Sequence, residues 1–332
     1  MQVGANACID TRVTHSWFPF THYCFIFSSQ AHSAQAHELI TGFLTMPASF
    51  VYVSTSPHVD LCVRSHQGVF DFPTILFIHG LGDSSLVWKS FFSDERLSDF
   101  TLLAPDLPGY GRTRMSKGTG GGIKEHVKHL LALIEETVGG PLLVVGHSLG
   151  GLIATYLVRA LEQMETKPSA EKTHSPVKLS GLINVEGNLT GADAFISSRS
   201  VRSDERGYFD DWYQAFVRTS YEGMWAEANP HLKHYPDSLR MADPEAFLRD
   251  CHDMVDLKNH TDDDSGENEA GGEYLKIIAP KLYVYGTESI PQITMDFLDR
   301  NKLATHVFES AGHWAMLDDP ETFTGLLLER LR

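Results

Sequence analysis

The chain is poor in cysteine and has no long apolar run. Its 332 residues include four cysteines, which are too few and too scattered for a disulfide framework or a zinc site: Cys8, Cys24, Cys62 and Cys251. We therefore expect free thiols in a reducing compartment, and a cytoplasmic protein. Since no stretch approaches the roughly 20 apolar residues of a membrane helix, no membrane span is expected.

Basic residues are also scarce relative to acidic ones. The chain has 27 Lys and Arg against 43 Asp and Glu, which gives a formal net charge of −16 at pH 7. A surplus of this size repels phosphate backbones and anionic lipid, so nucleic acid is not an expected partner and a small-molecule substrate is. The number of subunits is left open by these features.

The sequence pattern predicts an α/β fold with a mostly parallel central sheet and helices on both faces. Short apolar runs typical of buried strands alternate with amphipathic stretches. The expected strands are 50–54, 59–64, 74–78, 101–104, 141–145, 179–185, 281–285 and 306–308, and the expected helices are 123–138, 149–164, 291–301 and 320–331.

The alternation is interrupted once, which divides the chain into segments. Residues 188–272 are rich in aromatic residues without a strand-helix rhythm, so we expect a helical cap that encloses the substrate, ending in a flexible acidic loop at 261–272. The core is then formed by residues 46–187 and 273–332. Residues 1–45 lack periodicity and are expected to be a disordered extension.

Gly146-His147-Ser148-Leu149-Gly150 is a G-x-S-x-G pentapeptide in the context that gives the motif its meaning. It follows the apolar run PLLVV and opens the amphipathic stretch LGGLIATYLVRAL. A sharp strand-to-helix turn requires strained backbone angles and close approach of neighbouring backbone, which the two glycines allow. We therefore expect Ser148 to be a nucleophile raised above the sheet.

A second glycine turn, His79-Gly80-Leu81-Gly82, follows the apolar run TILFI. Its backbone amides are free to point into the space above the serine. We expect the amides of Leu81 and Leu149 to form an oxyanion hole, in which charge develops during acyl transfer.

His313 is the expected general base, because the order nucleophile, acid, histidine requires a histidine after the last strand. The other histidines have different expected roles. His126 and His129 are expected on a solvated helix face, His147 is expected to point away from the nucleophile, and His79 is expected to be a structural hydrogen-bonding residue.

The motifs HGLG, APDLPGYGRT, GHSLGG and SAGHW together resemble the α/β-hydrolase superfamily over residues 50–332. The resemblance implies a lid inserted after the sixth strand, a Ser-His-acid triad and hydrolysis without a metal or organic cofactor. In this superfamily the hydrolysis is commonly of esters, and with the aromatic-rich cap we expect a small to medium apolar ester to be cleaved through an acyl-enzyme. A lactonase, a C–C bond hydrolase and a slow-turnover receptor of the same fold are the alternatives.

The acid of the expected triad has two candidates. Most members of this superfamily carry an Asp after the seventh strand, where this chain has Ser289, with Glu288 one residue early. Glu186 directly follows the sixth strand, and Gly187 behind it gives the backbone freedom to aim a long side chain at the histidine. We therefore expect Glu186 to be the acid, with Glu288 as the alternative.

Overall fold

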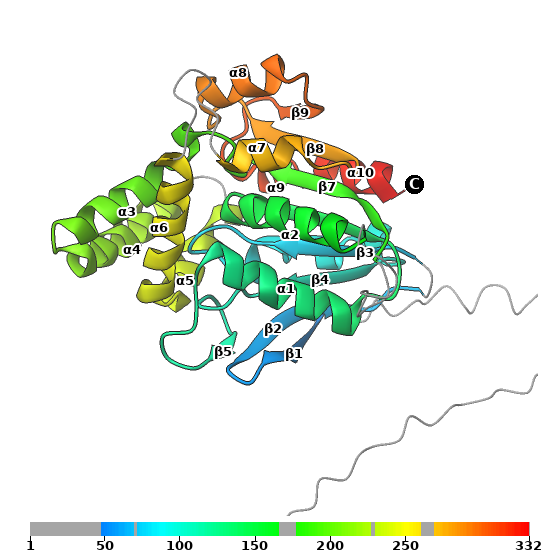
Figure 1. The fold of residues 1–332 in the computed structure, drawn as a ribbon, viewed down its shortest axis with the longest axis horizontal. Coiled ribbons are helices and arrows are strands. Elements are labelled where there is room, and N and C mark those ends of the chain that lie inside the picture. The colour runs from blue at the N-terminus through cyan, green and yellow to red at the C-terminus, as the bar shows by residue number, and fades with distance from the viewer. Residues whose placement is uncertain (1–47, 70–71, 166–176, 227–229, 260–268, 332) are drawn as a thin grey trace, which may run out of the picture. The chain divides into compact units, whose positions relative to one another are not determined.

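A computed structural model of the chain describes residues 48–69, 72–165, 177–226, 230–259 and 269–331. Within these residues, nine strands form one sheet in the order β1-β2-β4-β3-β6-β7-β8-β9, with β5 paired to β2 (Figure 1). The strands are β1 (Ser49–Ser56), β2 (Val59–His66), β3 (Thr74–Ile78), β4 (Thr101–Pro105), β5 (Arg114–Met115), β6 (Leu142–His147), β7 (Leu179–Val185), β8 (Lys281–Gly286) and β9 (Thr305–Phe308).

The sheet is antiparallel at one edge and parallel elsewhere. The pairs β1–β2, β2–β4 and β2–β5 are antiparallel, and every pair from β4 to β9 is parallel. The fully buried runs TILFI of β3 and TLLAP of β4 fit strands covered on both faces. The parallel order brings the carboxyl ends of β3, β6, β7 and β8 to one edge of the sheet, where ligands bind in such folds. The predicted α/β fold is confirmed.

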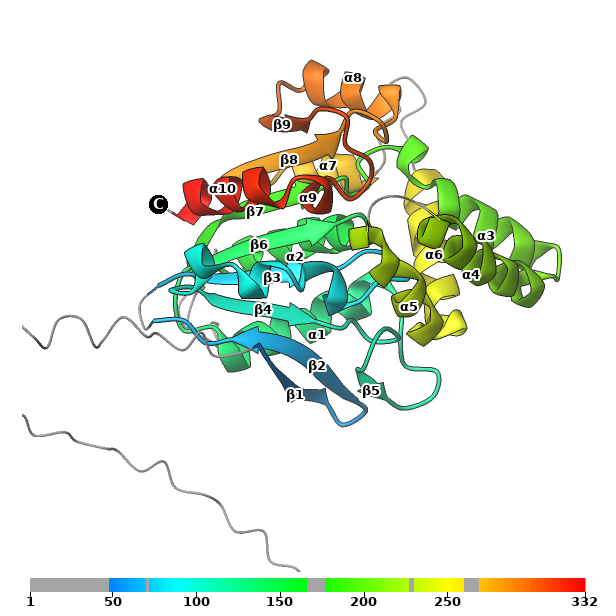
Figure 2. The ribbon, with the colours of Figure 1, turned by 180° about the vertical axis from the view of Figure 1, so that it is seen from behind.

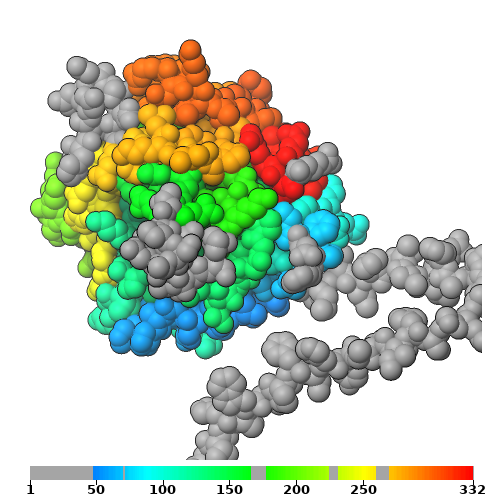
Figure 3. Space-filling model, turned by 45° about the vertical axis from the view of Figure 1, so that its right-hand side comes forward, coloured from blue at the N-terminus to red at the C-terminus, as the bar shows by residue number. Residues whose placement is uncertain are grey.

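Helices cover both faces of this sheet (Figures 1 and 2). One face carries α1 (Ile123–Thr137), α2 (Leu149–Glu165) and α7 (Glu269–Leu275), and the other carries α9 (Ala315–Asp318) and α10 (Pro320–Leu331), with α8 (Gln292–Arg300) near the β9 edge. Each face has its own buried apolar cluster. Figure 3 shows α7 beside α2, where Arg159 Nε donates to Glu273 Oε2 at 3.2 Å.

The face of α1 predicted to be solvated is buried, so that expectation for two histidines is wrong. His126 is 0% exposed and His129 is 3% exposed. His126 Nε2 lies 3.0 Å from Asp250 Oδ1, and His129 Nδ1 lies 2.7 Å from Thr55 Oγ1. Helix α6 (Pro244–Asn259) and the β1–β2 hairpin cover this face, and both are distant in sequence from α1.

The segment between β7 and β8 contains further helices that lie beyond the carboxyl edge of the sheet (Figure 1). They are α3 (Phe195–Glu205), α4 (Phe209–Ala226), α5 (His234–Met241) and α6. The predicted flexible loop at 261–272 is wrong at its end, because residues 269–272 begin α7 and bury Ala270. The rest of that loop, through residue 268, and the predicted 1–45 extension lie outside the described residues.

Two further features concern the described residues as a whole. None of their helices combines the length and the apolar character needed to cross a membrane. Cys62 and Cys251 are buried free thiols, as expected, whereas Cys8 and Cys24 lie outside the described residues.

Candidate active site

Ser148 occupies a strained turn between β6 and α2. Its φ is +54°, a conformation that non-glycine residues rarely adopt. A Cβ at Gly146 would lie 2.2 Å from the carbonyl oxygen of Gly150, and a Cβ at Gly150 would lie 2.3 Å from that of Ile78. Both positions therefore require glycine, and the turn they permit raises Ser148 over the carboxyl edge of the sheet.

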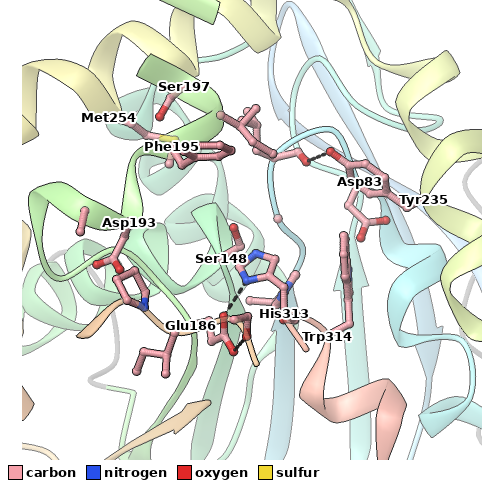
Figure 4. A pocket seen from close by; sticks show the side chains of 18 of the residues that line it. Asp83, Ser148, Glu186, Asp193, Phe195, Ser197, Tyr235, Met254, His313 and Trp314 are labelled. Atoms are coloured by element: carbon pink, nitrogen blue, oxygen red, sulfur yellow. Dashed lines mark hydrogen bonds and ion pairs between the residues drawn. The ribbon is translucent and has the colours of Figure 1, made fainter. Parts of the chain in front are cut away.

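His313 lies between Ser148 and Glu186 (Figure 4). His313 follows β9, and its Nδ1 donates to Glu186 Oε2 at 2.7 Å. This hydrogen bond assigns the ring proton of the neutral imidazole to Nδ1 and leaves Nε2 as an acceptor. Glu186 itself has a φ of +49° directly after β7, and this second strained turn directs its side chain toward the histidine.

The two candidate carboxylates differ sharply in their surroundings. Glu186 is 8% exposed, and its Oε1 accepts hydrogen bonds from the Gly286 amide at 2.8 Å and Ser289 Oγ at 2.6 Å. Glu288 is exposed, and its amide donates to the Ala311 carbonyl. The structure brings Glu186, and not Glu288, to His313.

Ser289 has a part in the site that sequence reasoning missed. Its hydroxyl holds the carboxylate of Glu186 from the side opposite His313. Its position in the sequence could have indicated this role, because Ser289 stands where most members of the superfamily place the acid. A serine there supplies a donor to a carboxylate that comes from the neighbouring strand.

The two residues whose amides are expected to form the oxyanion hole both lie close to Ser148. Leu149 is the first residue of α2, so its amide has no acceptor inside the helix. Leu81 lies in the turn after β3 and lines the same cavity as Ser148. A Cβ at Gly80 would lie 3.1 Å from Ser148 Cβ, so this turn passes close to the serine. Within the described part of the chain, neither amide donates to a protein acceptor.

Two other histidines near the serine are fixed by hydrogen bonds. His147 Nε2 donates to the carbonyl of His313 at 2.9 Å, and the centroids of the two imidazole rings lie 4.7 Å apart. Burial, followed by the nearby His313, lowers the pKa of His147 to about 3, so this ring is neutral. His79 accepts from the Leu107 amide and donates to the Gly80 carbonyl, the structural role expected for it.

A cavity of about 560 Å³ extends from Ser148 and His313 toward the cap. The cap side is lined by Ala192, Asp193, Phe195, Ile196, Ser197, Tyr235 and Met254. The sequence predicted that an aromatic-rich cap encloses the substrate. Trp212, however, does not line this cavity: inside the cap it stacks on Phe216, with the two ring centroids 5.2 Å apart. The cap aromatics therefore mainly pack against one another.

The acidic side chains that line the cavity are Asp83, Glu186 and Asp193, and no Lys or Arg of the described chain lines it. Two of these acidic side chains are paired with histidines, Asp83 with His234 and Glu186 with His313. Across residues 48–331, leaving out the undescribed gaps, no three His, Cys, Asp or Glu side chains are grouped so as to hold a metal ion.

Comparison with known proteins adds three findings. A family model described as the alpha/beta hydrolase family matches residues 75–325. The chain is 35% identical to lipase LipV of Mycobacterium tuberculosis over 86 residues, 26% of this chain and 31% of the lipase. It is 22% identical to 2-hydroxy-6-oxo-2,4-heptadienoate hydrolase of Pseudomonas putida over 275 residues, 76% of this chain and 87% of that protein.

Solved structures share the fold. A carboxylesterase of the thaumarchaeon Nitrososphaera gargenis superposes with a TM-score of 0.62 at 18% identity, covering 85% of this chain and 97% of that one. The chain spans less than a third of the lipase's length, so that match concerns only part of the relative.

Proposed function

Because the chain belongs to the alpha/beta hydrolase family, we propose that it is a serine hydrolase that cleaves neutral, small to medium apolar carboxylic esters. One observation carries this proposal: the 2.7 Å hydrogen bond that links Glu186 to His313, beside the strained Ser148, at the end of a largely apolar cavity. Nucleophile, base and orienting acid are then arranged for acyl transfer.

The proposed reaction has two halves. Ser148 Oγ attacks the ester carbonyl carbon while His313 Nε2 takes the hydroxyl proton, and the amides of Leu81 and Leu149 bind the oxyanion. The intermediate collapses, the C–O bond to the alcohol breaks, and His313 returns the proton to the leaving oxygen. Water then attacks the acyl-enzyme by the same route and releases the acid. Glu186 holds the histidine tautomer and stabilises the imidazolium.

The charge of the cavity favours a neutral substrate. An anionic group placed in it would find no Lys or Arg of the described chain in the lining to compensate its charge. The relative from Pseudomonas putida is named for an anionic dienoate, so a lining without Lys or Arg in the described chain favours a neutral ester over that C–C bond cleavage. A lactone is also a neutral ester and fits the same reasoning.

A panel of p-nitrophenyl esters tests the proposal, with neutral acyl chains of two to ten carbons set beside a hemisuccinate. We expect turnover of the neutral esters, little of the hemisuccinate, and loss of all turnover in Ser148→Ala. Undiminished turnover in Ser148→Ala would refute the proposal. Stoichiometric labelling by a fluorophosphonate without turnover of any ester would support the receptor alternative instead.

We propose the cytoplasm as the compartment. The unpaired thiols of Cys62 and Cys251 support it, since they are consistent with a reducing environment.

A further inference from the structure

The turn that carries the Leu81 amide has a defined hydrogen-bond pattern. The Gly80 carbonyl accepts from the Asp83 amide at 3.2 Å, which closes a four-residue turn. Gly82, in the third position, has a φ of +72°, as a type II turn requires. The same Gly80 carbonyl accepts from His79 Nδ1 at 2.9 Å. Because carbonyl and amide point in opposite directions across a trans peptide, the Leu81 amide faces away from His79.

Three side chains of helix α5, in the cap, contact this turn and the residue that follows it. Tyr235 Oη donates to the Leu81 carbonyl at 3.2 Å, His234 Nε2 lies 3.1 Å from Asp83 Oδ2, and Ser238 Oγ lies 2.7 Å from Ser84 Oγ. Ser238 is four positions after His234 and three after Tyr235, so it lies on the same side of α5 as both.

These contacts act on Leu81 itself, because Tyr235 binds the peptide that directly follows the one carrying the Leu81 amide. The Leu81 carbonyl belongs to the central peptide, whose orientation distinguishes a type II turn from a type I turn. A Cβ at Gly82 would lie 2.6 Å from Leu239 Cδ1, so α5 also packs closely on the turn. Rotation of the central peptide would break the Tyr235 bond and change ψ of Leu81, so this bond restrains the residue that carries the expected oxyanion amide.

The contact between Asp83 and His234 is a buried ion pair. Burial opposes the charged form of each, yet the charge and hydrogen bond of His234 hold the pKa of Asp83 below its usual value, and Asp83 raises the pKa of His234. His234 Nδ1 lies 2.5 Å from the His231 carbonyl, so both ring nitrogens donate. The other titratable groups that act on the pair are His79 and His147 from the core, and Asp237 of α5.

We propose that α5 is a brace for the oxyanion hole, with Tyr235, His234 and Ser238 as positioning residues that orient the Leu81 amide toward the transition state. The proposal rests on the proposed esterase function and assigns the cap a part in catalytic rate as well as in substrate choice. A donor aimed at the oxyanion lowers the barrier only when its direction is fixed before the reaction.

Tyr235→Phe tests this, because it keeps the ring that lines the cavity and removes the hydroxyl. We expect kcat on one neutral ester to fall about tenfold, a fraction of the 10²–10³ lost when an oxyanion donor is removed outright. We expect KM to change less than about twofold, since binding of the ground state uses other contacts. The rate of fluorophosphonate labelling should fall with kcat, because the phosphonyl oxygen occupies the same hole.

Tyr213→Phe is the matched control. Tyr213 Oη donates to the carbonyl of Leu239 in the same helix at 3.0 Å, but Tyr213 does not line the cavity. Both variants should lower Tm by similar amounts, and only Tyr235→Phe should lower kcat. Ser238→Ala, which removes the bond to Ser84, should lower kcat in the same direction and serves if Tyr235→Phe does not fold.

The outcomes separate the inference from the proposed function. Three results would overturn the inference that α5 positions the Leu81 amide and leave the esterase proposal standing. They are equal kcat in wild type and Tyr235→Phe, an equal fall in kcat in both tyrosine variants, and a change confined to KM. If the wild type turned over no ester but reacted with the fluorophosphonate, the labelling rates of wild type and Tyr235→Phe would be compared instead. Equal labelling rates would overturn the inference. A wild type that neither turned over nor labelled would overturn both.

Discussion

Replacing Glu186 by glutamine is expected to lower kcat by about 10⁴-fold in a folded protein. The carboxylate accepts three hydrogen bonds, from His313, Gly286 and Ser289. In Glu186→Gln the amide oxygen still serves Gly286 and Ser289, so the amide nitrogen faces His313 Nδ1. That nitrogen donates, which moves the ring proton to Nε2, and Nε2 can then no longer accept the proton of Ser148.

The magnitude combines this wrong tautomer with the loss of the charge that stabilises the imidazolium. A 10⁴-fold loss corresponds to about 5 kcal/mol of transition-state stabilisation. Glu288→Gln is the matched control, because that exposed side chain makes no contact with His313 in the described structure, and we expect kcat within about twofold of wild type.

The assay is kcat for one neutral ester at one pH, with circular dichroism and Tm as controls for folding. A smaller loss in Glu186→Gln than in Glu288→Gln would refute the assignment and move the acid to the loop after β8. Equal losses would contradict the reasoning from hydrogen bonds.

Three other predictions follow from the site. Ser289→Ala removes one hydrogen bond to the active-site carboxylate, and steady-state kinetics should show kcat lowered by about 10- to 100-fold, from the roughly 1.5–3 kcal/mol of a bond to a charged group. Met254→Ala enlarges the cavity and should shift the kcat/KM ratio of long to short acyl chains about tenfold toward the long ones; Trp212→Ala, outside the cavity, should lower Tm and leave that ratio unchanged. The buried ion pair should restrict stability to a pH window, measured as Tm against pH. The contribution of Asp83 is fully present above about pH 4 and is lost as the pH falls through its lowered pKa, and that of His234 is fully present below about pH 6.5 and is lost as the pH rises through its raised pKa. A flat Tm profile across both limits would contradict the pair.

The sequence predicted the parts of the site that local patterns specify. Ser148 is recognisable because the glycines at 146 and 150, the preceding apolar strand and the following helix are all adjacent to it in the chain. His313 is recognisable from its place after the last strand. The sheet itself follows from the short apolar runs, whose burial on both faces the structure shows.

What the sequence left open depends on contacts between distant segments. Glu186 and Glu288 are both carboxylates at strand ends, and only their positions relative to His313, 127 residues from Glu186, distinguish them. The burial of His126 comes from a cap helix, through Asp250, 124 residues away. A helix pattern shows which residues share a face, but not which other segment covers that face.

The α5 brace was beyond sequence reasoning for the same reason. Asp83 and His234 are separated by 151 positions, and neither belongs to a recognised motif. The composition predicted a cap that encloses the substrate, whereas the inference that the cap also affects rate comes from three hydrogen-bonded contacts.

The most direct test of the central claim is to identify the residue that a fluorophosphonate modifies. The protein is labelled, digested and analysed by peptide mass spectrometry, before and after heat denaturation. Our account predicts a single adduct on Ser148 in the native protein and no adduct after denaturation. An adduct on another residue, or equal labelling of native and denatured protein, would contradict the claim that Ser148 is the activated nucleophile.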